Sequence, residues 1–155
     1  YHVISITGFT RQYLVDTYSV PADHVSLIYQ GTDVATFTPD PLRAAQARQR
    51  YPVPRDAFPV LGNVGSFEHR KGQVALLQAV AAVRTRLPQV HLLLVGDGPD
   101  EQMLRAEVAE LGLDSHVTFF PFAREPFHVF EVIDVLVLAP PIETRASAWA
   151  RPAGR

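Results

Sequence analysis

The sequence contains no cysteine, and only one lysine, one methionine and one tryptophan among its 155 residues. The absence of cysteine excludes disulfides, thiol catalysis and cysteine-ligated zinc. No apolar run approaches the ~20 residues that a membrane-spanning helix needs. The 14 basic and 16 acidic residues give a formal net charge of −2, which argues against a strongly basic nucleic-acid-binding protein. We therefore expect a cytoplasmic protein with no spanning segment.

Apolar residues are plentiful, at 47% of the chain, whereas charged residues make up 19%. This balance is typical of a globular protein that can bury a core, and it argues against disorder. Almost all the basic residues are arginines, so Lys71 stands out as the position that kept a lysine.

The first third of the chain predicts a strand, a helix and a second strand, with Thr7 or Thr10 as the helix N-cap. An irregular, proline-containing stretch with one short helix follows and is interpreted as a linker. The predicted elements are strand 3–7, helix 9–18, strand 24–29 and helix 42–50.

Beyond residue 57 the pattern becomes regular. Apolar strands alternate with helices of 7 to 15 residues, which predicts βαβ units and an α/β, Rossmann-like doubly wound parallel sheet. Residues 90–95 and 134–138 are nearly continuous apolar runs, as expected of strands covered on both faces. The predicted strands are 58–64, 90–95, 116–120 and 134–138, and the predicted helices are 73–87, 99–111 and 126–132.

Three strand ends carry candidate chemistry, because open α/β sheets bind ligands beyond the carboxyl ends of their strands. In Gly65-Ser66-Phe67-Glu68-His69-Arg70-Lys71-Gly72, a glycine permits close backbone approach and two cations stand at a helix N-terminus. A phosphate-bearing ligand fits this arrangement. A solvated basic pair at a turn explains the same residues.

The other two strand ends are less specific. Gly96-Asp97-Gly98-Pro99 has the start of a dinucleotide fingerprint but lacks its third glycine, so a tight turn into a proline-initiated helix is the favoured interpretation. Glu143 follows the last predicted strand and is suited to accept hydrogen bonds from sugar hydroxyls, or is a plain loop residue. Six scattered histidines show no metal-ligand spacing, so no metal site is expected.

Together these segments resemble the retaining glycosyltransferases of family 4, also called group 1, along residues 4–143. Residues 25–33, followed by Phe37 and Pro39, are similar to the family's hinge, usually Val-Ile-Pro-Asn-Gly-Val-Asp and then Phe-x-Pro. Residues 65–72 are similar to its Gly-Arg-Leu-x₃-Lys-Gly loop. Leu94-Val-Gly-Asp-Gly-Pro99 and Asp134-Val-Leu-Val-Leu138 resemble its next two strand ends.

The resemblance implies a partial GT-B glycosyltransferase fold in which the C-terminal part of the sheet is missing. It also implies a domain organisation for the chain. Residues 1–38 would be the end of an N-terminal acceptor domain with the hinge, 39–57 a linker, and 58–143 a partial sugar-nucleotide-binding domain. Residues 144–155 form an atypical tail, rich in Arg, Ala, Pro and Gly, which we hypothesise to be an out-of-frame translation.

The resemblance further implies which residues hold a nucleotide-sugar donor, either a UDP-sugar or a GDP-sugar, with no additional cofactor. Lys71 would contact the diphosphate, with Ser66 at the family's usual arginine position and Arg70 in support. Glu143 aligns with the first glutamate of the family's E-x₇-E motif, whereas Arg151 stands at the second. The donor and phosphate residues would be Gly65, Ser66, Arg70, Lys71 and Glu143, and the nucleobase region Phe122, Ala123 and Arg124.

The function expected is that of a fragment of a glycosyltransferase, inactive by itself, which transfers a sugar to an acceptor that the sequence does not identify. Peripheral membrane association would come from the missing domain. Two alternatives stay open: a non-catalytic Rossmann-type nucleotide-binding module, and a fragment of an NAD-dependent oxidoreductase. An unpaired sheet edge with Leu136 and Leu138 exposed predicts a marginal or self-associating chain.

Overall fold

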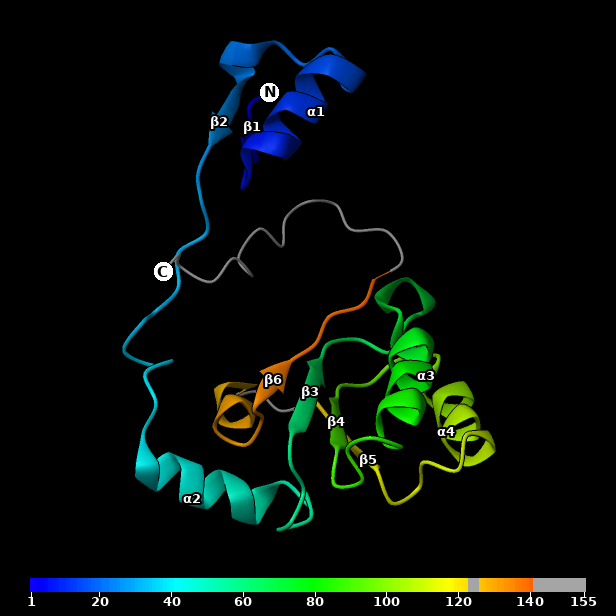
Figure 1. The fold of residues 1–155 in the computed structure, drawn as a ribbon. Coiled ribbons are helices and arrows are strands. Elements are labelled where there is room, and N and C mark those ends of the chain that lie inside the picture. Colours follow the sequence, from blue (N-terminus) through cyan, green and yellow to red (C-terminus); the bar gives the residue numbers. More distant parts are fainter. Residues whose placement is uncertain (123–125, 141–155) are drawn as a thin grey trace. The chain divides into compact units, whose positions relative to one another are not determined.

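A computed structural model describes residues 1–122 and 126–140 of the chain (Figure 1). These residues fall into two compact units, residues 1–34 and residues 35–140, and each unit is described by itself. Among the described helices, none is both long enough and apolar enough to cross a membrane.

The first unit is a parallel strand pair joined by a helix. Strand β1 (Val3–Ser5) pairs with β2 (Val25–Leu27), and α1 (Gly8–Tyr18) connects them, followed by a short 3₁₀ turn, η1 (Ala22–His24). Thr7 is the N-cap, because its Oγ1 accepts the backbone N–H of Thr10 at 3.0 Å. The predicted strand–helix–strand order is confirmed.

The second unit is built on four parallel strands in the order β5-β4-β3-β6. The chain runs outward from β3 through β4 to β5, and then returns to place β6 on the other side of β3. The doubly wound parallel sheet predicted from the sequence is therefore confirmed, and the strand order reverses between β3 and β6. The strands are β3 (Val60–Val64), β4 (His91–Val95), β5 (Val117–Phe120) and β6 (Val135–Leu136).

Helices cover both faces of this sheet (Figure 1). Helices α3 (Gln73–Val83) and α4 (Glu101–Glu110) pack on one face, whereas α2 (Pro41–Arg50) and the 3₁₀ helix η3 (Pro126–Glu131) pack on the other. The β4 side chains alternate between the two resulting cores, so every residue of that strand is buried. This double coverage explains its continuous apolar run.

Local sequence signals set the ends of several helices. Asp40 caps α2 by accepting the N–H of Leu42 at 2.8 Å. Helix α4 ends in a Schellman motif: Gly112 has φ 61°, its N–H donates to Ala109, and the N–H of Leu113 donates to Val108. Glycine is required at such a left-handed position because it has no Cβ.

Three sequence predictions differ from the structure. The helix predicted over 73–87 ends at Val83, where Arg84 turns to donate to the carbonyls of Leu111 and Gly112. The segment 126–132 is a 3₁₀ helix and not an α-helix. The strand predicted over 134–138 is only Val135–Leu136, and its side chains are exposed because β6 lies at the edge of the described sheet.

Candidate functional site

The reversal of strand order places a crevice at the carboxyl ends of β3 and β6, the usual ligand position in open α/β sheets. Three loops meet at this end of the sheet: residues 65–72 after β3, 96–100 after β4, and 137–140 after β6. A 3₁₀ turn, η2 (His69–Lys71), lies within the first of these loops and leads into α3.

Gly96 and Gly98 serve the packing of the neighbouring loop. A Cβ at Gly96 would lie 2.0 Å from the carbonyl oxygen of Gly65, and one at Gly98 would lie 2.4 Å from that of Phe67. The N–H of Phe67 also donates to the Asp97 carbonyl at 2.8 Å. Protein backbone thus occupies the space beside this Gly-x-Gly, which favours the tight-turn interpretation and speaks against an NAD-type fingerprint.

Gly65 is different, because the space beside it is open. No heavy atom lies within 4 Å of the position where its Cβ would stand, and its φ of 155° is one that residues with side chains rarely adopt. A ligand is therefore able to approach the backbone here, at the end of β3.

Glu68 interacts with two of the candidate phosphate-binding side chains. The Arg70 Nε donates to Glu68 Oε2 at 2.6 Å. The interaction with Arg70, followed by those with Ser66 and Lys71, lowers the pKa of Glu68. Sequence reasoning missed Glu68, although its place between Ser66 and Arg70 was a signal.

Lys71 is the remaining cation of the loop. Its side chain is half-buried at the end of η2, and among the described residues no hydrogen bond or ion pair holds its ammonium. A half-buried ammonium with no hydrogen bond or ion pair among the described residues, in the loop that begins at the open backbone of Gly65, is suited to an anionic ligand.

Two further residues, both missed by sequence reasoning, hold the loops after β3 and β6 in place through hydrogen bonds to main-chain carbonyls. The buried Gln73 side chain donates to the carbonyl of Ser66 at 2.9 Å and so closes the loop. The buried Asn63 side chain donates from Nδ2 to the Val137 carbonyl at 2.8 Å, whereas its Oδ1 has no partner. A polar residue in the middle of an apolar strand was the available signal for Asn63.

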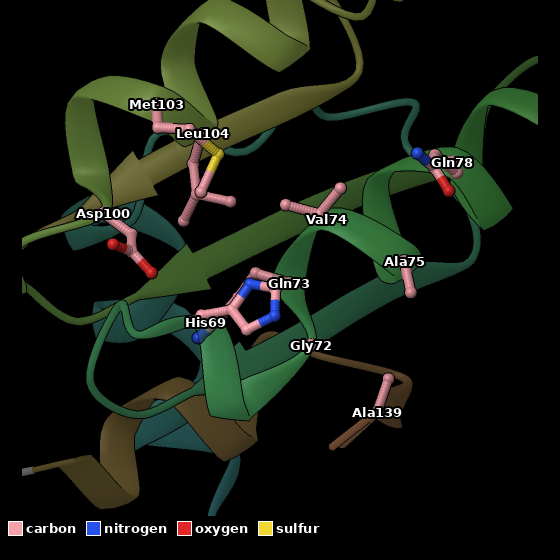
Figure 2. A pocket seen from close by; sticks show the side chains of 10 residues that line it. All are labelled: His69, Gly72, Gln73, Val74, Ala75, Gln78, Asp100, Met103, Leu104 and Ala139. Carbon is pink, nitrogen blue, oxygen red and sulfur yellow. The ribbon is translucent and has the colours of Figure 1, made fainter. Parts of the chain in front are cut away.

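A pocket of about 270 Å³ lies beside this loop, between the starts of α3 and α4 (Figure 2). His69, Gln73, Asp100 and Met103 are among its lining residues. Gly65, Ser66, Arg70 and Lys71 do not line it. The pocket is therefore adjacent to the predicted phosphate-binding side chains and separate from them.

Some predicted site residues lie outside the described residues, namely Ala123, Arg124 and Glu143. Phe122 is described and is 54% exposed, just beyond the carboxyl end of β5. Within residues 1–122 and 126–140, no cluster of three or more His, Asp or Glu side chains is placed to hold a metal ion.

A family model described as Glycosyl transferases group 1 matches residues 46–144, which is more than half of the chain. The chain belongs to this family. Solved structures of GT-B glycosyltransferases share its fold, which confirms the partial GT-B architecture expected from the sequence. HepE from Anabaena, solved with UDP-glucose, is 25% identical and matches with a TM-score of 0.76 over 90% of this chain and 38% of that chain.

Two other group 1 proteins illustrate the extent of the likeness. A GDP-mannose-dependent α-(1-6)-phosphatidylinositol monomannoside mannosyltransferase from Mycolicibacterium smegmatis is 30% identical over 148 residues, covering 94% of this chain and 37% of that protein. The C-terminal domain of a group 1 protein from Francisella tularensis matches with a TM-score of 0.61 at 22% identity, covering 73% of this chain and 60% of that domain. The chain thus spans about 37% of the length of its full-length relative.

Proposed function

We propose that this chain binds the diphosphate of a nucleotide-sugar donor over the carboxyl ends of β3 and β6, as part of an enzyme that transfers the sugar to an acceptor. The observation that carries the proposal is Lys71, whose ammonium has no hydrogen bond or ion pair among the described residues, in the loop that begins at the open backbone of Gly65. Its place at the reversal of strand order supports the same conclusion.

Each predicted site residue has a role in this proposal. Gly65 admits the phosphate to the backbone, Lys71 binds it, and Ser66 and Arg70 turn toward it. Phe122, Ala123 and Arg124 face the nucleobase, and Glu143 accepts hydrogen bonds from the donor sugar. No metal or additional cofactor is part of the proposal.

The domain roles extend to the rest of the chain. In this proposal residues 1–38 are the end of the acceptor domain with the hinge, 39–57 are a linker and 58–143 belong to the donor domain. The compartment we propose is the cytoplasm. Transfer needs donor and acceptor held in a fixed geometry, so we expect donor binding without transfer from these 155 residues.

The base of the nucleotide is left to experiment. The mycobacterial relative is named for GDP-mannose, whereas HepE was solved with UDP-glucose. Both nucleotides therefore belong in the test, together with ADP for comparison.

Isothermal titration of the chain with UDP, GDP and ADP tests the proposal. We expect binding of UDP or GDP, weakened about tenfold or more by Lys71→Ala, because a charge-assisted contact to phosphate is lost. Arg86→Ala is the control, since it also removes one positive charge but lies in the turn after α3, near the amino end of β4. Absence of binding by all three nucleotides, or equal losses in both variants, would contradict the proposal.

A non-catalytic nucleotide-binding module is the second candidate, because the chain covers little more than a third of its relatives. The two candidates differ in whether the longer protein to which this chain belongs transfers the sugar or only binds the nucleotide. Incubating that longer protein with UDP- or GDP-sugars and measuring release of the nucleoside diphosphate separates them: release that depends on Lys71 indicates transfer, and binding without release indicates the module.

A further inference from the structure

We infer that Glu68 is an internal anion that occupies the phosphate-binding side chains of the 65–72 loop, and that a ligand phosphate must take its place. The inference rests on the proposed function, since it concerns the same site. It assigns to Glu68 the role of lowering the affinity for the diphosphate, whereas Lys71, Ser66 and Arg70 contribute to binding it.

The contacts of Glu68 reproduce those that a phosphate oxygen would make. A carboxylate and a phosphate both accept from a guanidinium, and here Arg70 donates to the Glu68 carboxylate at 2.6 Å. The Arg70 side chain is 69% exposed and that of Glu68 is 34% exposed. Exchange of one acceptor for another therefore requires no opening of the core, because both side chains already reach solvent.

The charges of the loop also indicate that Glu68 opposes the binding of a diphosphate. With Glu68 ionised, the loop holds one negative and two positive side chains, so only the charge of Lys71 remains uncompensated. The ionised form is favoured because Arg70 donates a hydrogen bond to it, which, with the smaller influence of Ser66, holds the pKa of Glu68 below its ordinary value. An incoming diphosphate meets a like charge at Glu68 and an arginine that is already paired.

A second ion pair in the same unit supplies the control. Glu101 and Arg105 join at 2.7 Å on α4, with side chains 38% and 53% exposed, close to the exposures of Glu68 and Arg70. Glu101→Gln therefore removes the same charge from the same kind of pair, outside the 65–72 loop.

The test is titration of the wild-type chain, Glu68→Gln and Glu101→Gln with UDP, GDP and the uncharged nucleosides uridine and guanosine at low salt. Glutamine keeps an acceptor for Ser66 and Arg70 and removes only the charge. We expect Glu68→Gln to tighten diphosphate binding about fivefold, the scale of one exposed unit charge a few ångströms away. Nucleoside binding and the Glu101→Gln variant stay at wild-type values, and the gain shrinks as salt screens the loop.

Arg70→Gln completes a double-mutant cycle. If Glu68 occupies Arg70, this substitution weakens UDP or GDP binding more in the Glu68→Gln background than in the wild type. Equal effects in the two backgrounds would overturn the inference.

The outcomes separate the inference from the proposed function. If binding depends on Lys71 but Glu68→Gln leaves the affinity for UDP and GDP unchanged or lowers it, the inference is overturned and the proposed function stands. Binding of UDP or GDP by Glu68→Gln but not by the wild type supports both. If neither protein binds a diphosphate, both fail, because there is then no anion site for Glu68 to fill.

Discussion

Gly72 faces the main-chain carbonyl of Ala139 so closely that a Cβ on Gly72 would lie 1.7 Å from the Ala139 oxygen. Gly72 begins α3 and Ala139 follows β6, so this contact brings two walls of the crevice together at the switch point (Figure 2). The backbone of Gly72 is also left-handed, at φ 71°. One residue thus combines a conformational and a steric requirement for glycine.

Gly72→Ala is expected to destabilise the chain by about 3 kcal/mol or more, because the left-handed strain and a backbone clash add together. Gly112→Ala is the matched control: Gly112 has φ 61°, but the nearest atom to the added Cβ is on the flexible Arg84 guanidinium, 3.8 Å away. That variant should lose only about 1–2 kcal/mol, the conformational cost. Urea unfolding measures both, and equal losses would show that the Ala139 contact is unimportant.

The buried His91 predicts a dependence of stability on pH. Burial, and secondarily the charge of His116, hold the pKa of His91 below its ordinary value. The unfolded chain therefore takes up a proton at this residue near pH 6.5, where the folded chain does not. The free energy of unfolding should fall as pH drops from 6.5 toward the folded pKa, by up to about 1.4 kcal/mol per pH unit, and be unaffected above 6.5.

Urea midpoints between pH 7.5 and 5 test this prediction. His91→Gln keeps a polar group that can reach the Thr118 hydroxyl, the present partner of His91 at 2.9 Å, and should flatten the curve. The exposed His69 supplies the control, and His69→Gln should leave the pH dependence in place. A His91→Gln curve as steep as that of the wild type would contradict the assignment.

Asp134 joins the start of β6 to the start of β3 by two hydrogen bonds, one that it accepts and one that it donates. Its Oδ2 accepts the N–H of Val60 at 2.7 Å, and its own N–H donates to the Val60 carbonyl at 2.8 Å. Asp134→Ala leaves the Val60 N–H without its acceptor and should cost about 1–2 kcal/mol. Asp134→Asn retains an oxygen acceptor and should cost less than half as much in the same urea titration. Similar costs would mean that the charge, and not the hydrogen bond, stabilises this junction.

The alternation of apolar runs with helix signals was sufficient to predict the strand and helix order and the parallel sheet. The period of the apolar residues reports directly which backbone faces are buried. Leu92 and Leu93 illustrate this, since adjacent apolar residues on β4 pack into cores on opposite faces of the sheet. Sequence alone did not show that β6 lies at the described edge, because an apolar run looks the same wherever its strand lies in the sheet.

The candidate site was predicted at the level of the loop but not of its contacts. Gly65 has the open backbone expected of it, and the Lys71 ammonium has no hydrogen bond or ion pair among the described residues, while its contact with a diphosphate stays a prediction. The engagement of Ser66 and Arg70 by Glu68 could not be read from spacing, because each of these polar side chains has several partners within reach in a turn. Only coordinates decide which partner each one takes.

The exposed edge of β6 leads to a last prediction, about association. Val135 and Leu136 are exposed on β6, a short parallel strand that has a pairing partner on only one side within the described sheet, and Leu138 is exposed two residues beyond it. Such apolar edges are templates for pairing with another chain. Leu136→Lys should therefore shift the chain toward monomer in sedimentation velocity, because a charged side chain on the edge opposes association.

Leu87→Lys is the matched control for that experiment. Leu87 and Leu136 are both 46% exposed, but Leu87 lies in the turn before β4 and away from the sheet edge. If exposed apolar area alone drove association, both substitutions would reduce it equally. If the sheet edge drives association, only Leu136→Lys reduces it. A wild-type chain that sediments as a monomer at all concentrations would show that the short length and twist of β6 already protect this edge.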